Sequence, residues 1–241
     1  MPFRARRRRR AVVRRRRSVH VVHTARALLV TAVLAVMTLL AGCGAPQYTY
    51  VTNSADRTYV KLPTTWRPID KKALDNAIGL DPTLTDQERG LWLEGYDADS
   101  SPSPLHLFGP SASAPAAFVS VQQIPESARG QFSLDKLRDL FYPVSPAARQ
   151  AAEMDPTSGL TDFALISDNV LTPGHGLHGV HSVFRYKMGD GPLQMIDQTA
   201  YLNDDASKLY MFFVRCSTEC YQQRQSEIGN VVSSFTVRES S

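Results

Sequence analysis

The C-terminal third of the chain contains four segments with strand character, separated by short polar clusters. Each segment is rich in β-branched, aromatic and other large apolar residues, a composition typical of strands. Gly, Pro, Asn and Asp gather in the clusters at 172–179, 189–192 and 203–205, where the chain is expected to turn. Consecutive strands joined by short turns pair in antiparallel order. The sequence therefore predicts an antiparallel meander with strands over residues 163–171, 180–187, 193–202 and 208–216.

Shorter elements lie on both sides of this meander. Alternating apolar and polar residues predict further strands over 58–62, 118–124 and 234–237. Helical periodicity with suitable N-terminal caps predicts helices after Asp70 (71–78), after Ser133, at 147–154 and at 219–231. A capping box at Thr85 and Glu88 predicts another short helix that leads into Leu91, Trp92 and Leu93. Together these elements indicate the α+β class.

Residues 100–116 interrupt this regular pattern. The segment holds four prolines and five serines, and it contains few large apolar residues. Proline removes a backbone donor, and serine competes with the backbone for hydrogen bonds, so both residue types disfavour regular structure. The composition predicts a flexible surface loop.

The N-terminus has the organisation of an export signal. An arginine-rich start precedes an apolar run of 15 residues at 27–41, which is shorter than a membrane-spanning helix of about 20 residues. The run ends in Leu40-Ala41-Gly42-Cys43, which resembles the lipobox of bacterial lipoproteins. The resemblance implies that residues 1–42 are a removed signal peptide and that Cys43 carries diacylglycerol. The arginines leave both the general secretory and the twin-arginine export routes open.

Removing this leader reverses the charge of the protein. Eleven of the 27 basic residues and none of the 23 acidic residues lie in 1–42, so the mature chain carries 16 basic residues and a formal charge of −7. We therefore expect no nucleic-acid partner, because phosphate backbones attract basic surfaces. Residues 43–57 are polar and predict a flexible tether. The lipid on Cys43 is expected to attach the domain to the bilayer at the extracytoplasmic face of the cell membrane.

Two cysteines remain beside Cys43. Cys216 and Cys220 are four residues apart, and a helical start after Ser217 brings their Cα atoms to about 6 Å, within the range of a disulfide. Outside the cytoplasm such a pair favours a disulfide. Reactive or metal-binding thiols are the alternative, although no further cysteines follow at zinc-site spacing.

Several short motifs resemble those of PsbP-like proteins. Leu-Pro-Thr-Thr-Trp follows the first predicted strand, and the chain ends with Lys208-Leu209-Tyr210 and a helix leading into Val232-Ser233-Ser234-Phe235. The chain is similar to this family, which includes LpqN-type lipoproteins of actinobacteria. The resemblance implies a curved antiparallel β-sheet with helices packed on both faces, a single domain over 58–241, and binding or assembly roles without a shared catalytic set. A helical and loop insert at about 79–116 departs from the family pattern.

Three histidines form the densest group of possible metal ligands. His175, His178 and His181 lie within seven residues, and imidazole binds Zn, Cu or Ni. On a strand, however, His178 and His181 point to opposite faces. A loop could instead bring His175 and His178 together, with Asp168 or Asp190 as a third ligand. We favour polar turn residues over a metal site.

Other motifs give no catalytic prediction. Gly174, Gly176 and Gly179 spell G-x-G-x-x-G, but a β-rich segment follows where a nucleotide-binding loop requires a helix. No G-x-S-x-G elbow occurs. The remaining candidates are interpreted as structural: the acid pairs Asp97/Asp99 and Asp204/Asp205 as turn residues, His106 as a polar surface residue, and Trp66 and Trp92 as core anchors.

Three functions are compatible with these residues. The leading hypothesis is an outward-facing lipoprotein that binds an envelope protein or cell-wall component without catalysis and without a cofactor. The second is a carrier of a small or apolar ligand held between sheet and helices. The third is a hydrolase or metal-dependent enzyme, which requires a His with Asp or Ser in a cleft.

Overall fold

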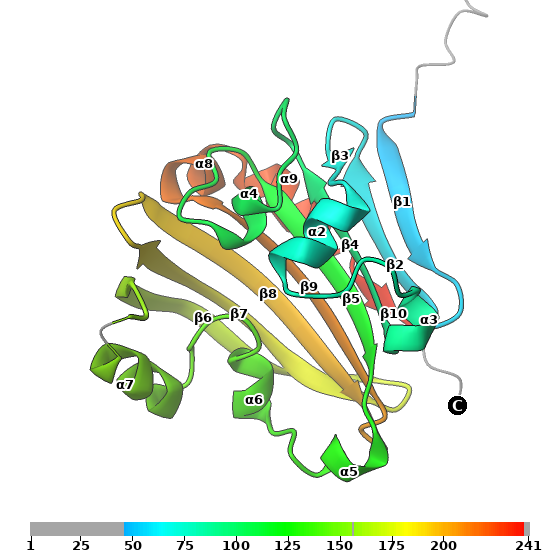
Figure 1. The fold of residues 1–241 in the computed structure, drawn as a ribbon. Coiled ribbons are helices and arrows are strands. Elements are labelled where there is room, and N and C mark those ends of the chain that lie inside the picture. The colour runs from blue at the N-terminus through cyan, green and yellow to red at the C-terminus, as the bar shows by residue number, and fades with distance from the viewer. Residues whose placement is uncertain (1–45, 156, 239–241) are drawn as a thin grey trace, which may run out of the picture. The chain divides into compact units, whose positions relative to one another are not determined.

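The computed structural model describes residues 46–155 and 157–238 (Figure 1). The elements described here belong to the unit Tyr48–Ser241. The predicted signal peptide and the lipidation site Cys43 lie outside the described residues. In the part of the chain that the structure describes, no helix has both the length and the apolar character required to cross a membrane.

A seven-stranded antiparallel sheet forms the centre of this unit, with strand order β3-β4-β5-β9-β8-β7-β6. The four predicted strands of the meander are β6 to β9, and each neighbouring pair is antiparallel, as predicted. The strands are β3 (Arg67–Pro68), β4 (Leu91–Asp97), β5 (Ala116–Gln123), β6 (Leu160–Gly174), β7 (Leu177–Met188), β8 (Leu193–Asn203) and β9 (Lys208–Ser217).

A second sheet contains three strands in the order β1-β2-β10: β1 (Tyr48–Asn53), β2 (Thr58–Pro63) and β10 (Thr236–Val237). The predicted tether at 43–57 is therefore wrong from residue 48 onward. Tyr and Thr have a strand propensity similar to that of the large aliphatic residues. Val51 pairs with Val60 of β2 and is buried. The polarity of β1 reflects its outer position, since Tyr50 is 68% exposed.

Short helices connect the strands, and three of them begin at the predicted caps. Asp70 accepts a hydrogen bond from the Ala73 amide, Thr85 and Glu88 form the predicted capping box, and Ser133 caps the helix that follows it. The predicted helix at 219–231 is two helices that meet at Arg224. The helices are α2 (Lys71–Ala77), α3 (Asp86–Arg89), α4 (Leu105–Phe108), α5 (Glu126–Arg129), α6 (Leu134–Arg138), α7 (Pro146–Met154), α8 (Thr218–Gln223) and α9 (Gln225–Val232).

Apolar clusters cover both faces of the large sheet. On one face, Phe212 and Val214 of β9 pack with Val60 of the small sheet and with Ile228 and Val231 of α9. On the other face, Phe118 of β5 and Phe213 of β9 pack with Leu74 of α2 and Leu107 of α4. The sheet curves between these layers (Figure 1). This confirms the predicted α+β class, a curved antiparallel sheet with helices on both faces.

The segment predicted as an insert contains a strand of the main sheet. Gly90, at φ 61°, ends α3 in the left-handed conformation, which a glycine adopts without strain. The chain then forms β4, which pairs with β5 along its whole length. The predicted short helix is therefore α3, and Leu91, Trp92 and Leu93, into which it leads, form the start of β4. The alternating burial of β4 follows from its two-sided packing.

The predicted flexible loop at 100–116 is also wrong, because the segment is held by a buried arginine. Arg215 of β9 is fully buried and donates from Nη1 to the Leu107 carbonyl (2.8 Å) and from Nη2 to the Gly109 carbonyl (2.9 Å). Gln194 accepts from both Arg215 and the Ala112 amide. These contacts bring α4 against the sheet, and no local sequence pattern encodes them.

Candidate functional site

The three predicted histidines do not gather at one point. His175 occupies the β6–β7 turn at φ 54°, while His178 and His181 lie on β7. His178 pairs across the sheet with Leu202 and His181 with Thr199, so their side chains leave opposite faces, as predicted. Within the described ranges, no three His, Cys, Asp or Glu side chains are grouped to hold a metal.

The glycine motif forms the turn between β6 and β7. Gly174 and Gly176 have φ values of 86° and 70°, which are open to glycine without steric cost. No helix follows, because β7 begins at Leu177. The turn role predicted for these glycines is confirmed for Gly174 and Gly176 and is wrong for Gly179, which lies within β7.

His181 belongs instead to a polar cluster with Asp197 and Tyr221. The His181 Nε2 atom lies 2.7 Å from Asp197 Oδ1, and the Tyr221 hydroxyl donates to Asp197 Oδ2 at 2.8 Å. The Asp197 side chain is 6% exposed and that of His181 is 27% exposed. A buried carboxylate therefore orients an imidazole that reaches solvent.

The protonation of this cluster follows from its geometry. The hydrogen bond to Asp197 raises the pKa of His181 against the opposing effect of burial, and the negative charge of Asp168 contributes in the same direction. Burial, together with the Asp197 charge, raises the pKa of Tyr221, which keeps the phenol protonated as a donor. No described residue hydrogen bonds to His181 Nδ1, so this nitrogen is available to a ligand.

A cleft of about 370 Å³ opens beside His181, and α9 forms its opposite wall. Tyr201 and Phe235 stack at a centroid distance of 6.0 Å, and a Cβ on Gly179 would lie 2.8 Å from the Tyr201 ring. The missing side chain of Gly179 thus makes room for the ring. The cleft is lined by Leu171, His181, Asp197, Thr199, Tyr201, Gly229, Val232, Ser233 and Phe235.

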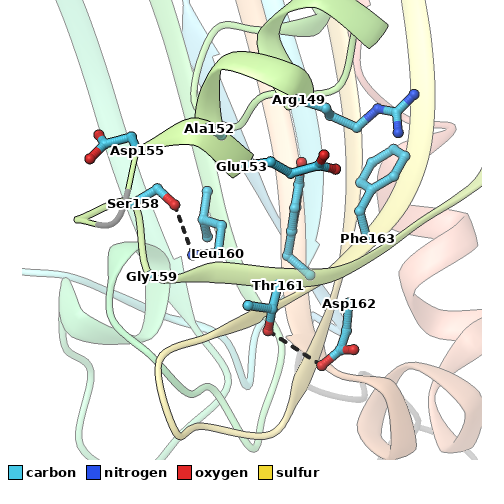
Figure 2. Close-up of a pocket in the computed structure, with 11 residues that line it drawn as sticks. Arg149, Ala152, Glu153, Asp155, Ser158, Gly159, Leu160, Thr161, Asp162 and Phe163 are labelled. Atoms are coloured by element: carbon cyan, nitrogen blue, oxygen red, sulfur yellow. Dashed lines mark hydrogen bonds between the residues drawn. The ribbon is translucent and has the colours of Figure 1, made fainter.

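A second cleft, of about 440 Å³, lies between α7 and the start of β6 (Figure 2). The Arg149 guanidinium lies over the Phe163 ring at 4.4 Å, and Tyr186 donates to the Pro143 carbonyl. Burial raises the pKa of Tyr186 to about 12. Glu153 and Asp162 add carboxylates to the wall, but the arginine and the aromatic side chains mainly attach α7 to the sheet.

A second histidine–aspartate pair shapes the loop before α4. Asp97 is fully buried and accepts from the Asp99 and Ser103 amides, and its Oδ2 lies 2.6 Å from His106 Nδ1. The turn role predicted for Asp97 and Asp99 is confirmed, since Asp99 in turn accepts from the Ser101 amide. The prediction that His106 is only a surface residue is wrong, because it pairs with this buried carboxylate.

The two tryptophans differ in their surroundings. Trp66 is 2% exposed, and its indole N–H donates to Glu227 Oε1 at 2.7 Å, so it is the predicted core anchor. Trp92 packs against the same apolar cluster but is only partly buried. It lines a third cleft of about 590 Å³.

The Cys216–Cys220 disulfide is present in the structure, with Cα atoms 5.9 Å apart. Cys216 ends β9 and Cys220 lies in the first turn of α8, whose N-cap Ser217 accepts from the Cys220 amide. The bridge therefore fixes the angle at which the chain leaves the sheet for α8.

Comparisons with known proteins show remote similarity only. No family model matches the chain, and no curated protein matches it. The cyanobacterial PsbP protein CyanoP from Synechocystis sp. PCC 6803 has 18% identity, coverage of 81% of this chain and 95% of its own, and a TM-score of 0.48.

Two further solved structures show similar coverage. LpqN, involved in cell envelope biogenesis of Mycobacterium tuberculosis, has 13% identity, coverage of 80% and 91%, and a TM-score of 0.40. The Ran-binding protein Mog1p of Saccharomyces cerevisiae has 9% identity, coverage of 81% and 97%, and a TM-score of 0.41. The neighbours include PsbP-like and LpqN proteins, as the sequence motifs suggested, but similarity at this level says nothing about function.

Proposed function

We propose that this protein is a membrane-anchored, extracytoplasmic lipoprotein that acts as a non-catalytic binding or assembly module for an envelope protein or cell-wall component. The arginine-rich leader and the Leu-Ala-Gly-Cys43 motif support the anchor. The Cys216–Cys220 disulfide is consistent with an oxidising compartment. Under this proposal the bilayer is contacted through diacylglyceryl-Cys43, and the acidic domain faces outward.

The observation that carries the binding role is the open part of the sheet at β6 and β7. Strand β6 is the outermost strand of the large sheet, and Leu165, Ile166 and Val170 are 47%, 57% and 55% exposed. The His181 cleft adjoins this strand through Leu171. Exposed apolar side chains beside an oriented polar cluster are typical of an interaction surface.

The enzyme alternative rests on the same His181–Asp197 pair. A hydrolase would need a nucleophilic hydroxyl bonded to the free imidazole nitrogen. Among the described residues, no Ser or Thr hydroxyl makes that hydrogen bond, and Tyr221 takes the second oxygen of Asp197. The cluster therefore favours recognition over catalysis. A carrier role would place its ligand in one of the clefts.

The anchor is tested by metabolic labelling with an alkyne fatty acid. Wild-type protein should carry the label, and mass spectrometry should find a mature N-terminus at lipidated Cys43. A Cys43→Ala variant should lose the label, while a Cys216→Ala/Cys220→Ala variant should keep it. An unmodified Cys43 thiol, or a leader still attached in the membrane fraction, would refute the anchor.

The binding surface is tested by site-specific photocrosslinking in living cells. A photoreactive amino acid at Val170 should capture a reproducible partner, and replacing Leu165 and Ile166 with Ser should reduce the yield by at least about tenfold if these side chains form the centre of the interface. The same photoreactive residue at exposed Gln222 of α8 is the matched control. Equal capture at both positions, or capture at neither, would contradict the assignment of this surface.

A further inference from the structure

The surroundings of Trp92 are those of a ligand-binding tryptophan. The residue lies on β4 opposite Val121, and it packs on the apolar cluster shared with the small sheet. Its indole N–H has no hydrogen-bond partner among the described residues, whereas the N–H of buried Trp66 is bonded to Glu227. Trp92 is only partly buried, and its N–H is not among the buried unpaired polar atoms of the described residues, so this donor is accessible to a molecule at the surface.

The cleft around Trp92 has the size of a small-molecule site. Its volume of about 590 Å³ lies within the range of ligand pockets. Leu91, Val121 and the Trp92 ring give it an apolar base. The polar wall comes from three separate elements: the β1–β2 turn, α3 and the end of β5. Its polar side chains are Asn53, Asp56, Asp86, Gln87 and Gln123.

Each carboxylate in this cleft already has a cationic partner. Asp56 Oδ1 lies 3.0 Å from Lys208 Nζ, and Asp86 Oδ1 lies 3.2 Å from Lys71 Nζ and 2.6 Å from Arg89 Nη2. The charges therefore compensate one another within the protein. This arrangement favours a neutral ligand over a metal ion, a phosphate or a cationic peptide, each of which would need an uncompensated charge opposite it.

The amide side chains of the cleft indicate which hydrogen-bonding groups a ligand would need. The Gln87 side chain is exposed and makes no hydrogen bond to a described residue, and the Gln123 side chain makes only a long contact of 3.4 Å to Asp56. An amide presents both a donor and an acceptor, and a paired carboxylate still has lone pairs to offer. Neighbouring hydroxyls of a sugar match these groups, and the C–H face of the sugar ring matches the flat indole.

We propose that the Trp92 cleft binds a neutral glycan chain of the kind that a cell wall presents. This inference rests on the proposed function, because an extracytoplasmic anchor is what brings the cleft to the wall. The cleft adjoins β4, near the opposite edge of the sheet from β6, so one domain can hold glycan and a protein partner on separate surfaces.

The test uses the full chain, expressed with its leader and purified from membranes in detergent. N-acetylglucosamine oligomers and β-linked glucose oligomers, which are both neutral, are titrated while tryptophan fluorescence and binding heat are recorded. Of the two tryptophans, only Trp92 borders the cleft, so the emission change should come from Trp92. The expected result is saturable binding that survives a rise in salt, because the recognition is not ionic.

Variants then assign the binding to named atoms. Trp92→Ala should raise the Kd by at least about tenfold. Trp92→Phe keeps a ring but loses the N–H, so its Kd should lie between those of Trp92→Ala and the wild type. Gln87→Ala should weaken binding, while the matched Gln222→Ala on α8 should not. If circular dichroism shows that Trp92→Ala is not folded, the alanine variants of the exposed residues Gln87 and Gln123 are used in its place.

Three outcomes would overturn the proposal: no binding of either glycan, undiminished binding by folded Trp92→Ala, or binding that moderate salt abolishes. None of them affects the labelling of Cys43 or the crosslinking at β6. Failure of the glycan site is therefore distinguishable from failure of the proposed lipoprotein function.

Discussion

Replacing Phe213 with alanine should remove the centre of the apolar cluster beneath α4. Phe213 is fully buried on β9 and contacts three aromatic rings, with centroid distances of 5.4 Å to Phe118, 5.3 Å to Phe141 and 6.3 Å to Phe108. Truncating a buried Phe costs about 3–5 kcal/mol, and aromatic pairs add about 0.5–1.5 kcal/mol each beyond their buried area. We therefore expect a loss near the upper end, about 4–5 kcal/mol.

Urea unfolding followed by circular dichroism measures this loss. The midpoint should fall while the slope of free energy against urea stays constant, because the variant unfolds from the same fold. Tyr50→Ala on β1 is the control, since that ring is 68% exposed, and it should change the free energy of unfolding by less than about 0.5 kcal/mol. A loss below about 2 kcal/mol for Phe213→Ala would show that the cluster does not pack as described.

Three further changes test the disulfide, the His181 cluster and the close approach of Gly179 to the Tyr201 ring. Replacing Cys216 and Cys220 with alanine should lower the free energy of unfolding by about 2 kcal/mol in denaturant titrations, because the bridge closes a short loop. The pKa of His181 is raised in the folded state, so its contribution to stability is complete below the unfolded pKa of 6.5 and is lost as pH rises through the folded pKa. The free energy of unfolding of His181→Asn should therefore change less between about pH 5.5 and about pH 8 than that of the wild type. An unchanged pH profile would refute the pair. Gly179→Ala should lower the free energy of unfolding by about 1–3 kcal/mol or more in thermal melts, because the new Cβ overlaps a carbonyl oxygen of β8. Gly130→Ala is the control and should be tolerated, because the space around its Cβ is open.

The strands of the meander were predictable because their signal is local. The predicted strand at 193–202 corresponds to β8 (Leu193–Asn203), and the one at 208–216 corresponds to β9 (Lys208–Ser217). Apolar runs bounded by turn residues can bury both sides only as central strands. The caps at Asp70 and Thr85 are equally local, because each consists of a side chain that accepts a hydrogen bond from the amide three residues later.

The candidate sites were less predictable because their partners are distant in the sequence. His181 and Asp197 lie on neighbouring strands, and Tyr221 comes from α8, so only the register of β7 against β8 unites them. Trp92 could be recognised as an aromatic residue, but its exposure depends on where the β1–β2 turn and α3 stop. No pattern near either residue contains that information.

The sequence by itself determined the antiparallel pairing of the C-terminal strands and the closeness of Cys216 to Cys220, because each depends on residues adjacent or nearly adjacent in the chain. Tertiary structure decided that β1 joins a sheet, that Arg215 fixes the proline-rich segment and that Trp92 stays open to solvent. In these cases the stabilising free energy comes from burial and from hydrogen bonds between distant segments, and these contacts exist only after the chain has folded.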